Sequence, residues 1–170
     1  MSGSVINGIP KWELRGIGMA LHYSTFSKDP STKVGSCLMD PYRVFHTGGY
    51  NGFPPGVKDS PSRYEDRGFK YPAVTHAETN ALDHCQMDVH GWTMFVWPVS
   101  PCSHCAGRII TRGITTVIAP LEAPDRMAEN HELADLLFEE GGVVIKKYPR
   151  QQIIEAFEEH SPWLNQAHSM

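Results

Sequence analysis

Four side chains of this 170-residue chain have the types and spacing that metal chemistry needs. The segment VTHAETNAL places His76 two positions before Glu78, and the segment PCSHC contains the Cys-x-x-Cys pair Cys102 and Cys105. One imidazole and two thiolates are suitable ligands for zinc, and three protein ligands leave the fourth position open for water, as in catalytic sites. A carboxylate beside that water, not bound to the metal, would accept and donate protons.

Each half of this pattern also has a simpler interpretation. Thr75 followed three residues later by Glu78 fits a capping box, in which the two side chains satisfy backbone donors at a helix start. The cysteine pair alone fits a redox site. His-x-Glu followed by Pro-Cys-x-x-Cys is, however, the signature of zinc-dependent deaminases, and both halves are present here in that order. The combined pattern therefore predicts a zinc site with Glu78 as its proton shuttle.

Composition and charge restrict the class of protein. Hydrophobic residues make up 41% of the chain and charged residues 20%, as in ordinary globular domains. No apolar run approaches the roughly 18 residues of a membrane span, and the N-terminal segment lacks the features of a signal peptide, so we expect a cytoplasmic protein without a membrane partner. The net charge of -4, without a basic stripe, argues against a nucleic acid polymer as partner and favours a small-molecule substrate.

The elements that position the four side chains follow from hydrophobic periodicity and from prolines and glycines. Apolar spacing predicts a first helix at about 11–27, and short apolar runs on either side of DPY predict a hairpin. A second helix is expected at about 76–88, and strands and helices then alternate to the C-terminal helix at about 150–160. This order, with the length of the chain, predicts one α/β domain over 1–170, with helices on both faces of the sheet and a parallel arrangement of the last three strands.

The two halves of the zinc pattern both follow strands in this scheme. Neighbouring parallel strands place the helix starts that follow them at the same edge of a sheet, so we expect the imidazole and the thiolates to meet there. Between the hairpin and the second helix lies a loop-like stretch at 50–72 with four prolines and three glycines. Loops of this length in compact domains are often functional, and we expect an ordered loop with a short helix near SRYEDRG.

Beyond the zinc motif, the chain resembles deoxycytidylate (dCMP) deaminases of the zinc-dependent cytidine and deoxycytidylate deaminase family. The similar stretches span about 12–148, and the most specific of them are GYNGFP and KYPAVTHAETNAL. The resemblance implies a three-layer α/β/α fold of the cytidine deaminase type, with a five-stranded mixed sheet. It implies hydrolytic deamination of dCMP to dUMP with release of ammonia, which supplies dUMP for thymidylate synthesis. It also implies a homohexamer, and in many members activation by dCTP with Mg²⁺ and inhibition by dTTP.

The resemblance assigns one zinc ion per subunit to His76, Cys102 and Cys105, and catalysis to Glu78. The substrate-binding candidates, which combine the resemblance with the need for positive charge at a 5'-phosphate, are Asn51, Ala77, Ser100, Pro101, Lys70, Tyr71 and Arg126. Further basic candidates for the phosphate are Lys58, Arg63 and Arg67. The candidates for an allosteric nucleotide site are Gly49, Tyr50, Gly52 and Asn80. Asn51 also has a structural interpretation, because Asn-Gly is a common turn pair.

Two alternatives stay open at this stage. The family commonly has a tyrosine in the loop after the fourth strand, near the substrate phosphate, whereas this chain has APLEAPDRMAENHE there. A deaminase of dCTP or of C5-modified dCMP is therefore an alternative to a dCMP deaminase. The alternative without catalysis is a zinc-stabilised nucleotide-sensing module, against which Glu78 argues, because a structural zinc site takes four ligands and needs no proton shuttle.

Overall fold

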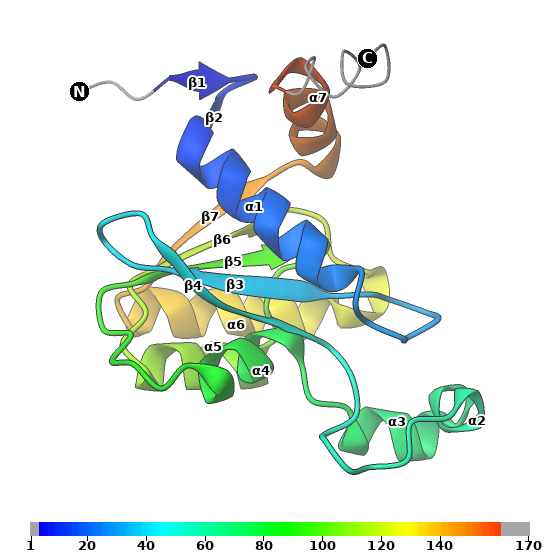
Figure 1. Ribbon diagram of the computed structural model, residues 1–170. Coiled ribbons are helices and arrows are strands. Elements are labelled where there is room, and N and C mark those ends of the chain that lie inside the picture. Colours follow the sequence, from blue (N-terminus) through cyan, green and yellow to red (C-terminus); the bar gives the residue numbers. More distant parts are fainter. Residues whose placement is uncertain (1–3, 161–170) are drawn as a thin grey trace.

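A five-stranded mixed sheet forms the centre of the computed structural model, which describes residues 4–160 apart from the side chain of Arg126 (Figure 1). In spatial order its strands are β4 (Phe45–Tyr50), β3 (Gly35–Met39), β5 (Thr93–Trp97), β6 (Thr116–Pro120) and β7 (Val144–Tyr148). Strand β3 runs antiparallel to both of its neighbours, whereas β5, β6 and β7 are parallel to one another. The predicted parallel arrangement of the last three strands is therefore confirmed.

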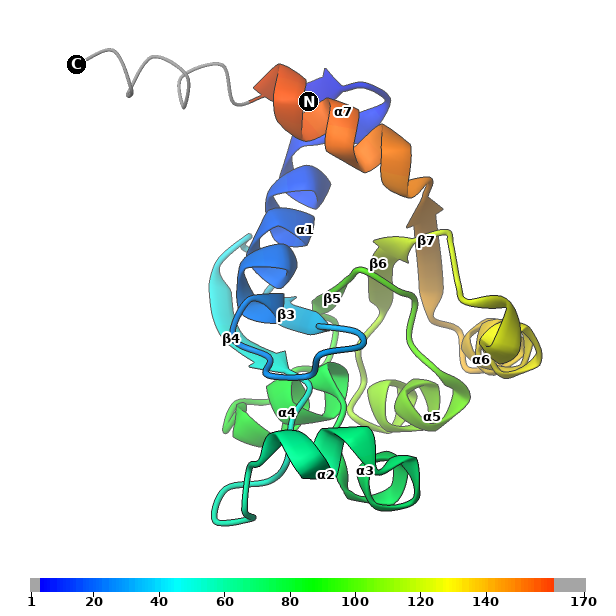
Figure 2. The ribbon, with the colours of Figure 1, turned by 90° about the vertical axis from the view of Figure 1, so that its right-hand side faces the viewer.

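Helices cover both faces of this sheet, which confirms the predicted three-layer α/β/α fold (Figures 1 and 2). One face carries α1 (Lys11–Ser24) and α7 (Arg150–His160), and the other carries α4 (Ala77–His84), α5 (Ser103–Thr111) and α6 (Ala128–Glu140). The side chains of successive strand residues point to opposite faces. Accordingly, Cys37 and Phe95 belong to the core beneath α1, whereas Leu38 and Met94 belong to the core beneath α4 and α5.

Five further elements lie outside this framework. The chain begins with a small hairpin of β1 (Val5–Ile6) and β2 (Ile9–Pro10), which the sequence analysis did not predict. The long loop after β4 contains α2 (Pro61–Glu65) and α3 (Arg67–Ala73), where we expected one short helix. A 3₁₀ turn, η1 (Asp125–Met127), precedes α6.

The second predicted helix is shorter than expected. Helix α4 ends at His84, not near residue 88, and Cys85 already has an extended backbone. The guanidinium of Arg112 donates hydrogen bonds to the carbonyl oxygens of Leu82, Cys85 and Met87. These bonds satisfy acceptors that a continuing helix would otherwise use. No helix in the described part of the chain is both long and apolar enough to cross a membrane.

Candidate active site

The predicted zinc ligands meet at one edge of the sheet, although the two strands that lead to them are not neighbours. Strand β3 lies between β4 and β5 and is antiparallel to both, so β4 and β5 point in the same direction. Helix α5 starts shortly after β5, and α4 starts after the long loop that follows β4. The expectation of neighbouring parallel strands was wrong for this pair, but the two helix starts lie at the same sheet edge.

His76, Cys102 and Cys105 form a compact cluster at these helix starts. His76 and Cys102 are the N-cap residues of α4 and α5, and Cys105 lies in the first turn of α5. Nδ1 of His76 lies 3.5 Å from Sγ of Cys102 and 3.3 Å from Sγ of Cys105. Their potential ligand atoms all lie within 4.8 Å of one another, and no other group of this kind occurs among residues 4–160.

The donor set and its spacing fit zinc. Bonds of about 2.0–2.3 Å to a tetrahedral zinc ion place neighbouring ligand atoms roughly 3.5 Å apart, close to the separations between the imidazole nitrogen and the two sulfurs. Hydrogen bonds from Cys105 and then His76 lower the pKa of Cys102 to about 3, and the bond to Cys102 raises the pKa of His76 to about 9. The same thiolate neighbour, together with burial, raises the pKa of Cys105. A second thiolate therefore requires a cation at this position, which a bound metal supplies.

Three neighbours that the sequence analysis missed support the cluster. The hydroxyl of Thr79 lies 4.0 Å from Sγ of Cys105. The side-chain oxygen of Asn130, on α6, accepts a hydrogen bond of 2.9 Å from the backbone nitrogen of Ser103 at the start of α5. The hydroxyl of Ser36 donates a 2.9 Å bond to the carbonyl of Ala77 at the start of α4. Thr79 was visible one position after Glu78, whereas the other two depend on tertiary contacts.

Glu78 is buried beside the cluster, with 3% of its surface exposed. Burial raises the pKa of its carboxyl group. The capping-box interpretation of Glu78 is wrong, because α4 has His76 as its N-cap and no side-chain cap. Thr75 instead pairs its backbone with Gly52. The carboxylate is therefore not used to cap the helix.

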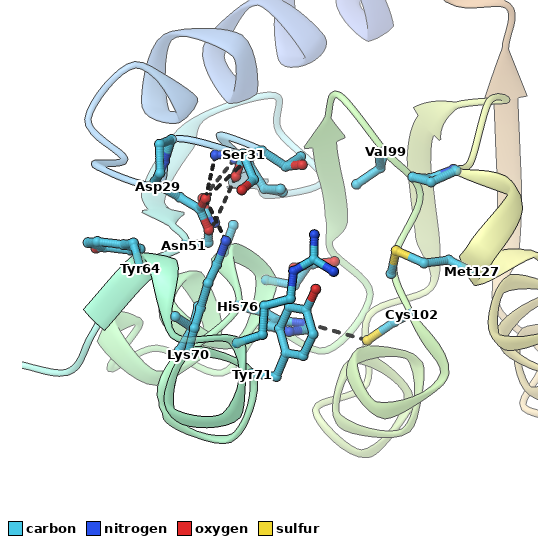
Figure 3. A pocket seen from close by; sticks show the side chains of 18 of the residues that line it. Asp29, Ser31, Asn51, Tyr64, Lys70, Tyr71, His76, Val99, Cys102 and Met127 are labelled. Atoms are coloured by element: carbon cyan, nitrogen blue, oxygen red, sulfur yellow. Dashed lines mark hydrogen bonds and ion pairs between the residues drawn. The ribbon is translucent and has the colours of Figure 1, made fainter. Parts of the chain in front are cut away.

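The cluster opens into a cavity of about 440 Å³ (Figure 3), a size that suits a small-molecule ligand. Of the predicted residues, those that line it are Asn51, Arg67, Lys70, Tyr71, His76, Ala77, Glu78, Ser100 and Cys102. Pro101 and Cys105 are buried next to it and do not contribute to the lining. The side chain of Arg126 lies outside the described part of the structure.

The side-chain amide of Asn51 makes three hydrogen bonds to the segment that follows α1. Its oxygen accepts a 2.8 Å hydrogen bond from the backbone nitrogen of Val34. Its nitrogen donates to the carbonyl of Thr32 at 2.9 Å and to the carboxylate of Asp29 at 3.3 Å. Asn51 therefore holds one wall of the cavity in place, and direct contact with a substrate stays a prediction.

The basic candidates differ in position. Arg67 and Lys70 line the cavity, whereas Lys58 and Arg63 do not. The guanidinium of Arg63 lies over the ring of Phe69 and donates a hydrogen bond to the carbonyl oxygen of Lys58. The ammonium of Lys70 lies 2.8 Å from the carboxylate of Asp29. Within the described residues, Arg67 is the lining cation without an ion-pair partner.

The predicted allosteric residues lie where β4 meets α4, and none of them lines the cavity. The amide of Asn80 donates a 2.7 Å hydrogen bond to the carbonyl of Tyr50. Gly49 packs directly against the backbone of α4, and Gly52 forms the bridge to Thr75. These contacts join the strand to the helix, and an effector site at these residues stays a prediction.

The fold and the site define a zinc-dependent nucleobase deaminase, and comparisons with known proteins give the family. The model of the cytidine and deoxycytidylate deaminase zinc-binding region matches residues 10–120. The chain belongs to this family. It is 35% identical over 144 residues to an uncharacterised deaminase of Aliivibrio fischeri (luxG 3' region), with 83% of this chain and 96% of that protein covered.

Named relatives and a solved structure point to one branch of the family, the deoxycytidylate deaminases. The human deoxycytidylate deaminase is 35% identical over 146 residues, which cover 81% of this chain and 80% of the human protein. The dCMP deaminase of cyanophage S-TIM5, solved in complex with dCMP and dUMP, superposes with a TM-score of 0.66 at 25% identity. That alignment covers 82% of this chain and 98% of the phage chain. The expected resemblance and the expected fold are thus both confirmed.

Proposed function

We propose that this chain hydrolyses dCMP to dUMP and ammonia, and so supplies dUMP for thymidylate synthesis. The observation that carries this proposal is the position of Glu78, a buried carboxylate in the same cavity as a three-ligand zinc cluster. A cluster with three protein ligands leaves one coordination position for water, which a structural site does not need. The names of the human and cyanophage relatives support dCMP as the substrate.

The chemistry depends on Glu78 as a carrier of protons. Zinc held by His76, Cys102 and Cys105 would lower the pKa of a water molecule towards neutrality. Glu78 would accept a proton from that water and deliver it to the ring nitrogen N3 while the water oxygen bonds to C4. It would then take the remaining proton of that oxygen and transfer it to the exocyclic amine, which leaves as ammonia when the C4–N bond breaks. Burial raises the pKa of Glu78, which brings its protonated form closer to the working pH and suits a group that must both accept and donate.

The rest of the cavity would orient the nucleotide. Ala77 and Ser100 line the cavity on the side of the zinc ligands, where we propose that their backbone contacts the amine end of the base. Arg67 and Tyr71, from α3, line the same cavity. We propose Arg67 as the cation for the 5'-phosphate, because Lys70 already pairs with Asp29, and Tyr71 as a further hydroxyl donor to the nucleotide.

A substrate panel tests the proposal. Ammonia release would be measured with dCMP, deoxycytidine, CMP, dCTP and a 5-substituted dCMP, with the zinc content determined on the same sample. The proposal predicts the highest kcat/KM for dCMP. A preference for dCTP or for the 5-substituted nucleotide would support the alternative substrate, and zinc binding without turnover of any pyrimidine would support a nucleotide-sensing module.

The remaining implications of the family resemblance are part of the same proposal. We expect a homohexamer in the cytoplasm, activation by dCTP with Mg²⁺, and inhibition by dTTP. Tyr50, which is partly exposed beside Asn80, provides a surface on which an effector base could stack. Titration of the dCMP reaction with dCTP and dTTP, with and without Mg²⁺, tests the regulation, and light scattering tests the assembly. Unchanged kinetics across these titrations would remove the allosteric part of the proposal.

A further inference from the structure

Residues 53–74 form an arm that leaves the body of the protein and returns to it. Gly52 and Thr75, at its two ends, exchange backbone hydrogen bonds of 3.1 and 2.9 Å. Figures 1 and 2 show that α2 and α3, which belong to the arm, lie outside the three layers. Inside the arm, the ring of Phe53 packs against Tyr64 and Phe69 at centroid distances of 4.6 and 5.6 Å. The arm thus has its own small core, and its orientation depends on few links to the body.

One of these links is the carboxylate of Asp29, which is 3% exposed. One of its oxygens accepts from the ammonium of Lys70 at 2.8 Å and from the backbone nitrogens of Ser31 and Thr32 at 2.8 and 3.3 Å. Its other oxygen accepts from the amide of Asn51 at 3.3 Å. Figure 3 shows that these groups converge at one side of the cavity. Asp29 therefore joins three segments: the loop after α1, the end of β4, and α3 of the arm.

The Asp29–Lys70 pair is buried, whereas the other ion pair between the arm and the body is exposed. Lys70 is 7% exposed, and a buried charge of this kind needs a partner to offset its desolvation. The second pair joins Lys28 to Asp59, whose side chains are 70% and 33% exposed. Exposed pairs contribute little to stability. Among the described residues, Asp29–Lys70 is thus the one buried ion pair that connects the arm to the body.

We infer that Asp29 is a positioning residue, which through Lys70 fixes α3 and thereby holds Arg67 and Tyr71 on the cavity wall. Lys70 then serves as a tether, and Arg67, one helical turn before it, contacts the phosphate. The inference rests on the proposed function, because it assumes a nucleotide 5'-monophosphate as the ligand. This inference also explains why a carboxylate can lie near a phosphate site. Lys70 neutralises Asp29, so the pair carries no net charge that would repel the phosphate.

Two substitutions and their combination separate a tether from a phosphate ligand. Asp29→Asn keeps an oxygen for the backbone nitrogens of Ser31 and Thr32 and removes the charge that holds Lys70. Lys70→Met keeps the aliphatic stem and removes the ammonium. For a tether, both changes raise KM for dCMP roughly tenfold to a hundredfold with kcat within about threefold, because a misplaced binding group weakens positioning without removing the chemistry. Zinc content stays at the wild-type level in both variants.

The combined variant Asp29→Asn/Lys70→Met guards against simple loss of folding. It leaves no buried charge without a partner, so its melting temperature should return towards that of the wild type. Its KM for dCMP should nevertheless stay high, because no bond replaces the tether. If KM and the melting temperature both returned to the wild-type values, the pair would have a structural role only, and the inference would be overturned. Asp59→Asn, which breaks the exposed pair with Lys28 and keeps a side-chain oxygen for Tyr64, is the matched control and should leave KM unchanged.

The opposite assignment predicts the opposite sign for one variant. If Lys70 binds the phosphate directly, Asp29→Asn releases its ammonium and lowers KM, whereas Lys70→Met raises it; this result would overturn the inference. The affinity for dUMP, measured by calorimetry on the same variants, reports whether the arm still positions its binding groups, and it does not depend on turnover. A wild-type protein that binds dUMP and does not turn over dCMP would refute the proposed function alone, and one that does neither would overturn both.

Discussion

Sγ of Cys105 lies 3.3 Å from Nδ1 of His76, although the two residues belong to different helices. Their separation depends on where α4 and α5 start relative to each other. Helix α5 starts shortly after β5, whereas α4 is held against β3 and β4 by close packing, in part through Gly49. The contact between β4 and α4 therefore sets the geometry of the metal site.

Substitution of Gly49 tests this dependence. A Cβ atom at this position would lie 2.4 Å from both the carbonyl oxygen of Ala77 and the nitrogen of Ala81, and these backbone atoms cannot rotate away. We expect Gly49→Ala to destabilise the protein by about 1–3 kcal/mol, as overpacked sites do, and to lower turnover because it displaces the start of α4. Urea unfolding and ammonia release measure the two effects.

Gly107, on the exposed face of α5, is the matched control. A Cβ atom there meets nothing within 4 Å. Replacement of a glycine by alanine inside a helix stabilises it by about 0.5–1 kcal/mol, so Gly107→Ala should raise stability. Equal unfolding midpoints for the two variants would contradict the packing argument.

Removal of the metal should affect both stability and activity. Without a metal ion, the neighbouring thiolate of Cys102 and burial raise the pKa of Cys105, so a second thiolate in the cluster is disfavoured. Dialysis against a chelator should abolish ammonia release and lower the melting temperature, because a ligand that binds only the folded state stabilises it. Added zinc should restore both. Full turnover by metal-free protein would show that the cluster is not part of the reaction.

Arg67 should matter for the phosphate and little for the chemistry. Arg67→Gln is expected to raise KM for dCMP about tenfold, equivalent to about 1.4 kcal/mol of binding, with a smaller change in kcat. Lys58→Gln is a suitable control, because Lys58 belongs to the same arm and does not line the cavity. Steady-state kinetics on both variants decide the matter, and an equal rise in KM would point to general electrostatic attraction instead of a specific contact.

His131 allows a test that does not involve catalysis. It is buried on α6, and neither ring nitrogen has a hydrogen-bond partner in the described structure. Burial, and then the nearby charge of Lys147, lowers the pKa of His131. Below a pH of about 6.5, the pKa of histidine in the unfolded chain, the unfolded chain binds a proton at His131 more readily than the folded protein does. His131 therefore makes the protein less stable as the pH falls through this value.

His131→Leu should remove this part of the pH dependence. The stability of the variant relative to the wild type should increase from pH 8 to pH 5, as measured by urea unfolding at each pH. It should also gain stability at pH 8, because a buried polar group without a partner is removed. A difference between variant and wild type that does not change with pH would contradict the assignment.

Much of the fold could be predicted because local signals coincide with the elements. Pro101 and Gly113 enclose α5, and the alternating order of elements requires crossover helices and hence parallel strands. The cluster of His76, Cys102 and Cys105 and the neighbouring Glu78 were also visible, because the two halves of the pattern together, in this order, have few other uses. The β1–β2 hairpin was missed despite a clear local signal: Asn7 and Gly8, with φ of 45° and 78°, form the Asn-Gly turn typical of hairpins.

The parts of the site that could not be predicted depend on tertiary contacts. Asp29 and Lys70 are 41 residues apart, and no local pattern relates a carboxylate after α1 to an ammonium in α3. The amide of Asn51 looked like a free substrate ligand because its partners, Thr32 and Val34, face it only across the folded loop. The end of α4 likewise depends on Arg112, which lies in another element.

The most direct test of the account compares Glu78→Gln with the wild type for zinc content, melting temperature and ammonia release from dCMP. Glutamine has nearly the same shape as glutamate and is not a proton carrier, and a neutral side chain is well tolerated in a buried position. We expect one zinc ion per chain, a melting temperature at least as high as that of the wild type, and a rate reduced by about 10²-fold or more. A variant that retains zinc and deaminates dCMP at close to the wild-type rate would contradict it.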